Sequence, residues 1–322
     1  MESAPSYRST ASRPRWSALP AHVRSSIEAA LGGPVVRADV AAGGFTRGFA
    51  AVLTVADGSR AFVKATSIDY LVDAYRRESS VVAALPTGVP AARLRWTASS
   101  HGWYVLCLDA ISGSMPSLPW SAADLAAALD AWALTAHLLR SGLATLDLPS
   151  FGDIARETFT VWRDIHGHQA PLPEMPRFAL AHLAELAQLE RRLVALAFSS
   201  EIMHGDLRLD NVLVEPGPAG TGGRAWLCDW NHVCRGPAWF DTLSLLVTAY
   251  ASGHDANALF AGHPTASAAP GDAPDAGLAA LAGLWLSRAG RASDASASIR
   301  QHQRWSGEMA LHWLGTRRGW IG

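Results

Sequence analysis

Three oxygen-bearing side chains in the second half of the chain are spaced so that they could hold a metal ion. Asp206 and Asn211 stand five positions apart in the segment HGDLRLDN, and Asp229 follows the apolar run AWLC. NVLVEP and RAWLCDW flank a glycine-rich loop, which predicts a hairpin centred near Gly220 that sets Asn211 beside Asp229. Carboxylate and amide oxygens suit Mg²⁺, which fills its remaining positions with water and phosphate. This pattern predicts binding of a metal–nucleotide complex.

A single lysine forms the second candidate. The chain has 27 Lys and Arg residues, and Lys64 in the strand-like run RAFVKAT is its only lysine. Glu78 follows 14 residues later and falls on the apolar stripe of a predicted helix over residues 69–85. A carboxylate on that stripe is costly to bury unless it is paired, and Lys64 is an available partner. The alternative is that Glu78 reaches solvent at the edge of the stripe, and the helix pattern does not decide between the two.

A glycine-rich turn precedes the strand that carries the lysine. Gly43, Gly44 and Gly48 lie in AAGGFTRGF, between two strand-like runs. Glycines in such a turn let backbone N–H groups approach a phosphate closely. Such hairpin turns are common, so this one is weak evidence by itself. It is not a Walker A loop, because no Gly-Lys-Ser/Thr follows.

The order of these features resembles the aminoglycoside phosphotransferase and choline kinase-like families, distant relatives of protein kinases. Glycine-rich hairpin, strand lysine, helix glutamate, HGDLRLDN and CDW follow one another over roughly residues 35–250. The resemblance implies an α+β, protein kinase-like fold with two lobes: a small antiparallel β N-lobe with one key helix, and a larger, mainly helical C-lobe. Trp230 and Asn231 replace the Phe-Gly that follows the metal aspartate of protein kinases, which favours a small-molecule kinase.

The resemblance also implies roles for residues of the catalytic loop and metal site. Asp206 would orient the acceptor hydroxyl and take its proton, while Asn211 and Asp229 would hold Mg²⁺ on the phosphates of ATP. Arg208 could reach the γ-phosphoryl group during transfer, or it could form a salt bridge on the loop, and both interpretations stay open. His204 would brace the loop by hydrogen bonds.

For the nucleotide, the resemblance implies contacts from the N-lobe. Lys64, held by Glu78, would contact the α and β phosphates, and the turn from Gly43 to Gly48 would cover them. The backbone from Asp109 to Ile111 would form the hinge that hydrogen-bonds adenine.

Two polar residues near the loop have simpler interpretations. Asp241 could support the loop or cap a helix, and Asp210 is expected to be solvated.

Length and composition agree with two lobes. The chain has 322 residues, 49% of them hydrophobic, which is enough for two cores. We expect a disordered tail over residues 1–17, an N-lobe over 18–110 and a C-lobe over 111–322. An Ala/Gly/Pro-rich stretch over 261–277 predicts a surface loop. Helices are predicted in the C-lobe at 121–142, 177–198, 238–252, 276–290 and 298–318.

Charge and cysteine content limit the classes of partner and the cellular location that we expect. The net charge of −1 gives no electrostatic reason to expect nucleic acid or a membrane surface. Cys107, Cys228 and Cys234 match neither a disulfide framework nor a zinc site, which suits a reducing cytoplasm. No apolar run reaches the about 20 residues of a membrane span. We therefore expect a cytoplasmic protein whose partners are a nucleotide and a small hydroxylated acceptor, of open oligomeric state.

The sequence thus favours an ATP- and Mg²⁺-dependent phosphotransferase acting on a hydroxyl of a small molecule. The alternatives are a catalytically silent ATP-binding scaffold, or a kinase of the choline, sugar or amino-alcohol type. Residues 251–322 hold five acidic groups against six Arg, which gives no positive support to a polycationic acceptor such as an aminoglycoside. Asp164 and Glu174 are possible walls of the acceptor pocket, and the choice between ATP and GTP stays open.

Overall fold

The structure is a computed structural model. It describes Pro5, Gly43 and residues 13–41, 47–140, 142–143, 145–217, 223–290 and 297–321. The expected tail over residues 1–17 lies largely outside the described residues. Among the described residues the first regular element is the short 3₁₀ helix η1 (Trp16–Ala18), which starts before the boundary predicted at residue 18.

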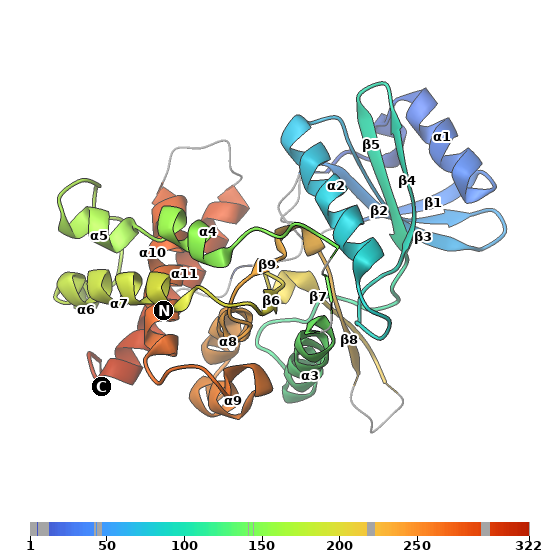
Figure 1. The fold of residues 1–322 in the computed structure, drawn as a ribbon. Coiled ribbons are helices and arrows are strands. Elements are labelled where there is room, and N and C mark those ends of the chain that lie inside the picture. Colours follow the sequence, from blue (N-terminus) through green and yellow to red (C-terminus); the bar gives the residue numbers. More distant parts are fainter. Residues whose placement is uncertain are drawn as a thin grey trace.

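The N-lobe is a five-stranded antiparallel sheet with one helix on each face (Figure 1). The strand order is β1-β2-β3-β5-β4. Val23 and Ile27 of α1 pack on one face of the sheet, and α2 covers the other. The elements are α1 (Ala21–Leu31), β1 (Val35–Val40), β2 (Phe49–Val55), β3 (Arg60–Thr66), α2 (Asp69–Ala84), β4 (Leu94–Ser100) and β5 (Trp103–Asp109).

Alternation along β3 determines which of its side chains reach α2. Val63 packs in the core shared with α1, so the next residue, Lys64, projects from the opposite face. Lys64 pairs with Ala50 of β2 and Leu106 of β5, which places it in the middle of the sheet. The only lysine therefore enters the space beside α2 from a strand that is fixed on both sides.

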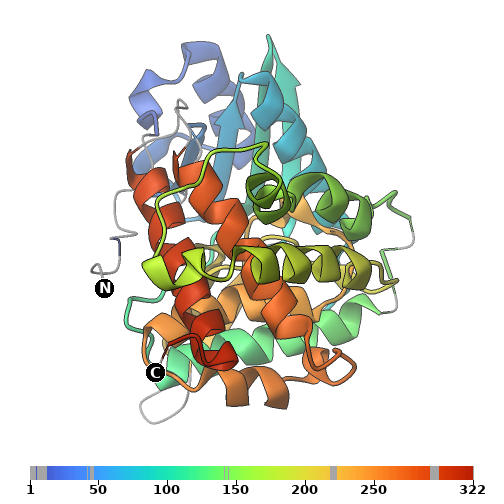
Figure 2. The same ribbon diagram turned by 90° about the vertical axis from the view of Figure 1, so that its left-hand side faces the viewer.

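The C-lobe is mainly helical, with α10 and α11 side by side (Figure 2). Two short antiparallel pairs, β6 with β9 and β7 with β8, lie on its N-lobe side (Figure 1). The helices are α3 (Ala122–Leu139), α4 (Phe151–Thr158), α5 (Val161–His166), α6 (Arg177–Leu180), α7 (Leu183–Leu196), α8 (Trp239–Ala251), α9 (Ala256–Gly262), α10 (Ala273–Gly290) and α11 (Ala297–Arg318). The remaining elements are β6 (Ile202–Met203), η2 (Leu209–Asn211), β7 (Val212–Glu215), β8 (Arg224–Leu227), η3 (Trp230–His232), β9 (Cys234–Arg235) and η4 (Pro264–Ala266).

The prediction of a surface loop over residues 261–277 is wrong for its last five residues, 273–277. α10 already begins at Ala273, and Ala273, Ala276 and Gly277 are buried. The small residues that suggested a loop instead allow close packing. A Cβ on Gly277 would meet the Leu243 side chain of α8 at 2.3 Å, so the two helices approach closely at this glycine.

One helix among the described residues, α3, has the length and apolar composition of a membrane span, with a mean hydropathy of 1.2. It packs against β7, β8 and α8. The indole Nε1 of its Trp132 donates to Thr242 Oγ1 of α8 at 3.0 Å. These contacts make α3 a core helix of the C-lobe.

Candidate active site

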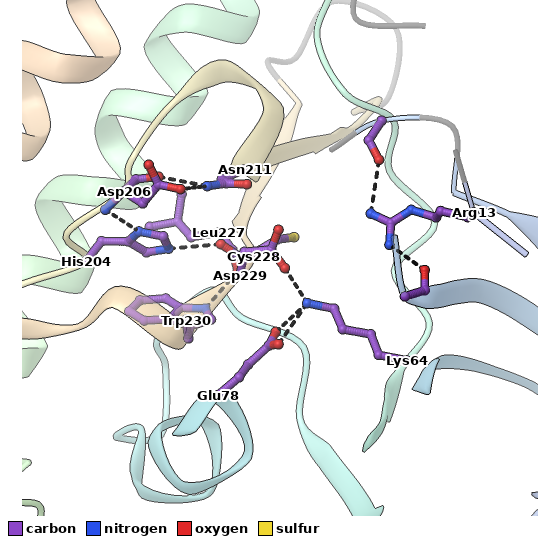
Figure 3. A network of polar contacts seen from close by, with 12 residues as sticks. Arg13, Lys64, Glu78, His204, Asp206, Asn211, Leu227, Cys228, Asp229 and Trp230 are labelled. Carbon is purple, nitrogen blue, oxygen red and sulfur yellow. Dashed lines mark hydrogen bonds and ion pairs between the residues drawn. The ribbon is translucent and has the colours of Figure 1, made fainter. Parts of the chain in front are cut away.

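Lys64 and Glu78 form a buried ion pair between the sheet and α2. Nζ of Lys64 donates to both carboxylate oxygens of Glu78 at 2.8 Å (Figure 3). Glu78 is 1% exposed, so it faces the interior and does not reach solvent at the edge of its helix. The same ammonium also pairs with the carboxylate of Asp229, which comes from the C-lobe. One lysine thus joins the two lobes at this point.

The ionisation of this cluster follows from its charges. Burial by itself would lower the pKa of Lys64, but the carboxylates of Asp229 and Glu78 raise it above its ordinary value. Burial would raise the pKa of Asp229, and Lys64 outweighs it, so that this pKa falls to about 2. Lys64 is therefore a cation and Asp229 an anion at neutral pH. A charged, pre-ordered pair of this kind suits the binding of a metal–phosphate group.

Asp229 stands just after β8 with an unusual backbone. Its φ of 61° and ψ of 60° lie in the left-handed region, which a non-glycine residue seldom adopts. η3 follows at once and packs against α2. This turn directs the Asp229 carboxylate to Lys64. The Asp229 side chain remains 39% exposed.

The predicted hairpin is present, with its register shifted by one residue. Val212 pairs with Leu227, so Asn211 stands opposite Cys228 and not opposite Asp229. The Cys228 N–H donates to the Asn211 carbonyl at 2.9 Å, which keeps Asn211 and Asp229 at the same end of the hairpin. Hairpin register depends on the turn, which a count of residues about Gly220 does not determine.

Asn211 is oriented by Asp206. Its amide nitrogen donates to the Asp206 carbonyl at 2.7 Å and to Asp206 Oδ2 at 3.1 Å. Figure 3 shows the amide oxygen pointing away from Asp206 as a result. The Asn211 amide oxygen and the Asp229 carboxylate are hard donors of the kind that Mg²⁺ accepts, and Mg²⁺ needs only one or two protein ligands besides phosphate. The two residues fit the predicted metal site.

Asp241, in the first turn of α8, holds the loop that precedes Asp206. Its carboxylate accepts the backbone N–H groups of His204 at 2.7 Å, Gly205 at 3.0 Å and Leu207 at 3.4 Å. Burial raises its pKa to about 7, against the lowering effect of these donors. Asp241 makes no cap hydrogen bond at the start of α8, so of the two interpretations the structure shows loop support.

His204 connects this loop to the strand before Asp229. Burial lowers its pKa to about 4, so the ring is neutral at pH 7. Its Nε2 lies 2.9 Å from the Cys228 carbonyl oxygen, which can only accept, so Nε2 carries the proton. Gly205 follows with φ of 80°, and a Cβ there would meet the His232 carbonyl at 2.2 Å, so only glycine fits.

Arg208 forms the predicted salt bridge on the loop. Its Nε and one Nη each donate to Asp210 at 3.2 Å, and the same Nη lies 3.3 Å from Asp206 Oδ2. The Asp210 side chain is 1% exposed, so the prediction that Asp210 is solvated is wrong. A carboxylate on this short 3₁₀ turn folds back onto its own loop because Arg208 is within reach. Burial raises the pKa of Asp206, with Arg208 opposing it, which makes Asp206 a better proton acceptor.

The nucleotide-side predictions fall partly outside the described residues. Gly43 and Gly48 stand at the two ends of the turn between β1 and β2, and Gly44 lies outside the described residues. Asp109 ends β5, where its carboxylate accepts from Arg95 Nε at 2.8 Å, and Ile111 follows in the connection between the lobes. The hinge role of Asp109 and Ile111 stays a prediction.

Sequence reasoning missed one residue of this site. Arg13, in the segment expected to be a disordered tail, donates to the carbonyls of Gly43 and Gly48, both at 3.2 Å. No periodic pattern surrounds Arg13 in the segment SRPRW, so the sequence offered no signal for this contact.

Asp164 and Glu174 both line a cavity of about 650 Å³ in the C-lobe. Glu174 pairs there with Arg304 of α11. Burial lowers the pKa of His302, also in α11, to about 4, and the charges of Arg208 and Asp210 on the catalytic loop act on it. α11 therefore contributes to the cavity wall and lies within electrostatic reach of the catalytic loop.

The model of the phosphotransferase enzyme family matches residues 44–280 of the chain. No curated protein is matched by sequence. Among solved structures, the chain is similar to the GDP and kanamycin complex of APH(2")-IIia, with a TM-score of 0.63, 13% identity, and coverage of 93% of this chain and 99% of that one. It is similar to spectinomycin phosphotransferase APH(9)-Ia in complex with ADP and spectinomycin, with a TM-score of 0.58, 11% identity, and coverage of 89% and 97%.

A third similar structure is an aminoglycoside phosphotransferase from Alicyclobacillus acidocaldarius, with a TM-score of 0.53, 15% identity, and coverage of 85% of this chain and 92% of that one. At these identities the similarity shows the fold. The predicted two-lobed α+β fold and the resemblance to aminoglycoside phosphotransferases are confirmed.

Proposed function

The chain belongs to the phosphotransferase enzyme family, and on that premise we propose that it transfers the γ-phosphoryl group of ATP, bound with Mg²⁺, to a hydroxyl of a small molecule. The observation that carries this proposal is the single ammonium of Lys64 held between Glu78 of the N-lobe and Asp229 of the C-lobe. Two carboxylates around one buried ammonium are costly to assemble, so a purely structural role does not account for them. Binding of the phosphates of a nucleotide does account for them.

Different residues of the chain would bind the phosphates and the metal ion. Lys64 would contact the nucleotide phosphates, kept in place by Glu78, while Asn211 and Asp229 would hold Mg²⁺. When bound, the metal ion would supply positive charge beside the phosphate oxygens. Most of the rate enhancement would then come from positioning and charge stabilisation and not from covalent chemistry.

Asp206 would accept the proton of the acceptor hydroxyl. Its raised pKa fits that role, because a carboxylate with higher proton affinity is a stronger base. Arg208, paired with Asp210 and close to Asp206, would keep the Asp206 carboxylate in one orientation. That position also leaves Arg208 near the point where the phosphoryl group would pass.

The acceptor would bind in the 650 Å³ cavity between α4, α5, α10 and α11. Its walls carry both charges, with the carboxylates of Glu157, Asp164 and Glu174 and the guanidinium groups of Arg288 and Arg304. Such a mixed lining suits a hydroxylated molecule that is neutral or zwitterionic better than a polycation. Sugars and amino alcohols therefore come before aminoglycosides among the acceptors to test.

The proposal includes a cytoplasmic location, where ATP is available and free thiols persist. Cys107, Cys228 and Cys234 are all free in the structure.

The test is an ADP-release screen of the purified protein with Mg-ATP or Mg-GTP against sugars, amino alcohols, hydroxy amino acids, choline and aminoglycosides. We expect phosphate transfer to at least one acceptor, and we expect Asp206→Ala to abolish it while nucleotide affinity changes less than threefold. A protein that binds nucleotide and transfers phosphate to no acceptor would instead be a silent scaffold. An Asp206→Ala variant with near wild-type turnover would remove Asp206 from the proposed role.

A further inference from the structure

Arg13 lies before the first helix of the N-lobe, yet its side chain reaches the glycine-rich turn. One Nη donates to the Gly48 carbonyl and the other to the Gly43 carbonyl, both at 3.2 Å. These carbonyls stand at the two ends of the turn between β1 and β2, so one guanidinium bridges the turn (Figure 3). The rigid fork of arginine can hold two carbonyls at once, which the single ammonium of lysine does less well.

The charge of Arg13 acts on the same groups as Lys64. Nζ of Lys64 lies 5.6 Å from the centre of the Tyr75 ring, and the positive charge of Arg13 also acts on Tyr75 and Glu78. Figure 3 shows the guanidinium directed toward the side of the site where Lys64 and Asp229 lie. Two cations from different parts of the chain therefore face the same part of the site.

A polar group beneath the turn points to a ligand at this place. The hydroxyl of Tyr75 is buried and has no hydrogen-bond partner among the described residues. It lies under Gly48, where a Cβ would meet the Tyr75 oxygen at 2.5 Å. A buried hydroxyl without a partner costs free energy, and a phosphate oxygen that enters under the turn would satisfy it.

We propose that Arg13 is a positioning residue of the phosphate subsite, which holds both ends of the glycine-rich turn and adds a second positive charge opposite the nucleotide phosphates. This inference rests on the proposed function and extends the nucleotide site to the segment that precedes the N-lobe. Because Arg13 would act on phosphates, its contribution to affinity should be present for a ligand with phosphates and absent for a ligand without them.

The test compares ADP with adenosine as ligands of the full-length protein, by calorimetry. Arg13→Gln should weaken ADP binding about tenfold and leave the affinity for adenosine within twofold of wild type. The matched control is Arg15→Gln, which changes an exposed arginine two positions away and should leave both affinities unchanged. If the Gln variant does not fold, Arg13→Lys keeps the charge without the two-point contact and should weaken ADP binding at least threefold.

The outcomes separate this inference from the function on which it rests. Equal losses for ADP and adenosine would show general damage to the lobe and would overturn the inference. An Arg13→Gln variant that binds ADP as wild type does, while Lys64→Met loses ADP, would overturn the inference and leave the proposed function standing. A wild-type protein that binds neither ligand would overturn both.

Discussion

His204 and Cys228 are joined by a hydrogen bond from the imidazole Nε2 to the carbonyl oxygen at 2.9 Å. The first residue precedes Asp206 on the catalytic loop, and the second precedes Asp229. A neutral ring thus connects the segment of the proposed base with the segment of the proposed metal ligand. Protonation would take place at Nδ1, which accepts from the Asp206 N–H at 3.4 Å, and it would put a charge in a buried place, which makes the connection sensitive to pH.

Stability should fall below neutral pH because of His204. Its pKa is about 4 in the folded protein and 6.5 as a free side chain. Below pH 6.5 the unfolded chain binds a proton that the folded protein does not, so stability is lost as the pH falls toward 4. His204→Gln keeps an N–H donor without titrating. Between pH 7.5 and 5.5, wild type should lose about 1.3 kcal/mol more free energy of unfolding than this variant, measured by urea titration.

His302 also has a pKa of about 4, but it is present in both proteins and its contribution cancels. Equal losses in wild type and His204→Gln would mean that His204 does not stay neutral in the fold.

Asp241→Asn should loosen the catalytic loop. The carboxylate accepts from three backbone N–H groups, whereas an amide offers one oxygen and turns its own N–H₂ toward the loop. Leaving a buried N–H without an acceptor costs about 1–3 kcal/mol of stability. We expect kcat to fall at least tenfold, because Asp206 follows directly on this loop, with a smaller change in nucleotide affinity.

The matched control is Asp255→Asn, since Asp255 caps α9 by accepting from the Ala258 N–H at 3.0 Å and Asn caps a helix as well as Asp does. Equal stability and kcat in the two variants would show that the Asp241 charge is dispensable.

Lys64→Arg should impair the protein although it keeps the charge. Nζ of Lys64 fits between two carboxylates in a space where the residue is 7% exposed, and a guanidinium is larger and planar. We expect kcat/KM for Mg-ATP to fall at least tenfold in steady-state kinetics. Arg60→Lys, the reverse change at an exposed position of the same strand, should leave kcat/KM unchanged. Wild-type kinetics in Lys64→Arg would show that only the charge matters there.

The sequence predicted the charged residues of the site better than the contacts that hold them in place. Lys64, Glu78 and Asp229 could be found because a lone lysine, an inward glutamate and a hairpin end each break a local pattern. The structure shows that Glu78 faces inward, one of the two outcomes that the helix pattern left open, and there it pairs with Lys64.

The supporting contacts join positions that no local pattern relates. Asp241 reaches back 37 residues to His204, and Arg13 reaches forward 35 residues to Gly48. Asp210 is buried because one neighbouring arginine folds over it, and composition does not show this. Such contacts depend on how each lobe folds, and the sequence indicates at most the residue types that could make them.

Tyr75→Phe should not destabilise the free protein, because the hydroxyl that it removes is buried without a partner among the described residues. Removing a buried polar group that makes no hydrogen bond recovers its desolvation cost. The matched control is Tyr104→Phe, whose hydroxyl is also buried but lies 2.8 Å from Ser79 Oγ and should cost about 0.5–1.5 kcal/mol. Urea titration of both variants separates the two cases.

If a phosphate oxygen satisfies the Tyr75 hydroxyl in the nucleotide complex, the increase in Tm on adding ADP should be smaller for Tyr75→Phe than for wild type. A Tyr75→Phe variant that loses as much stability as Tyr104→Phe without any ligand would show that the hydroxyl is already bonded in the free protein. In that case the hydroxyl would not be available to a phosphate oxygen, and its place beneath Gly48 would serve only the packing of the N-lobe.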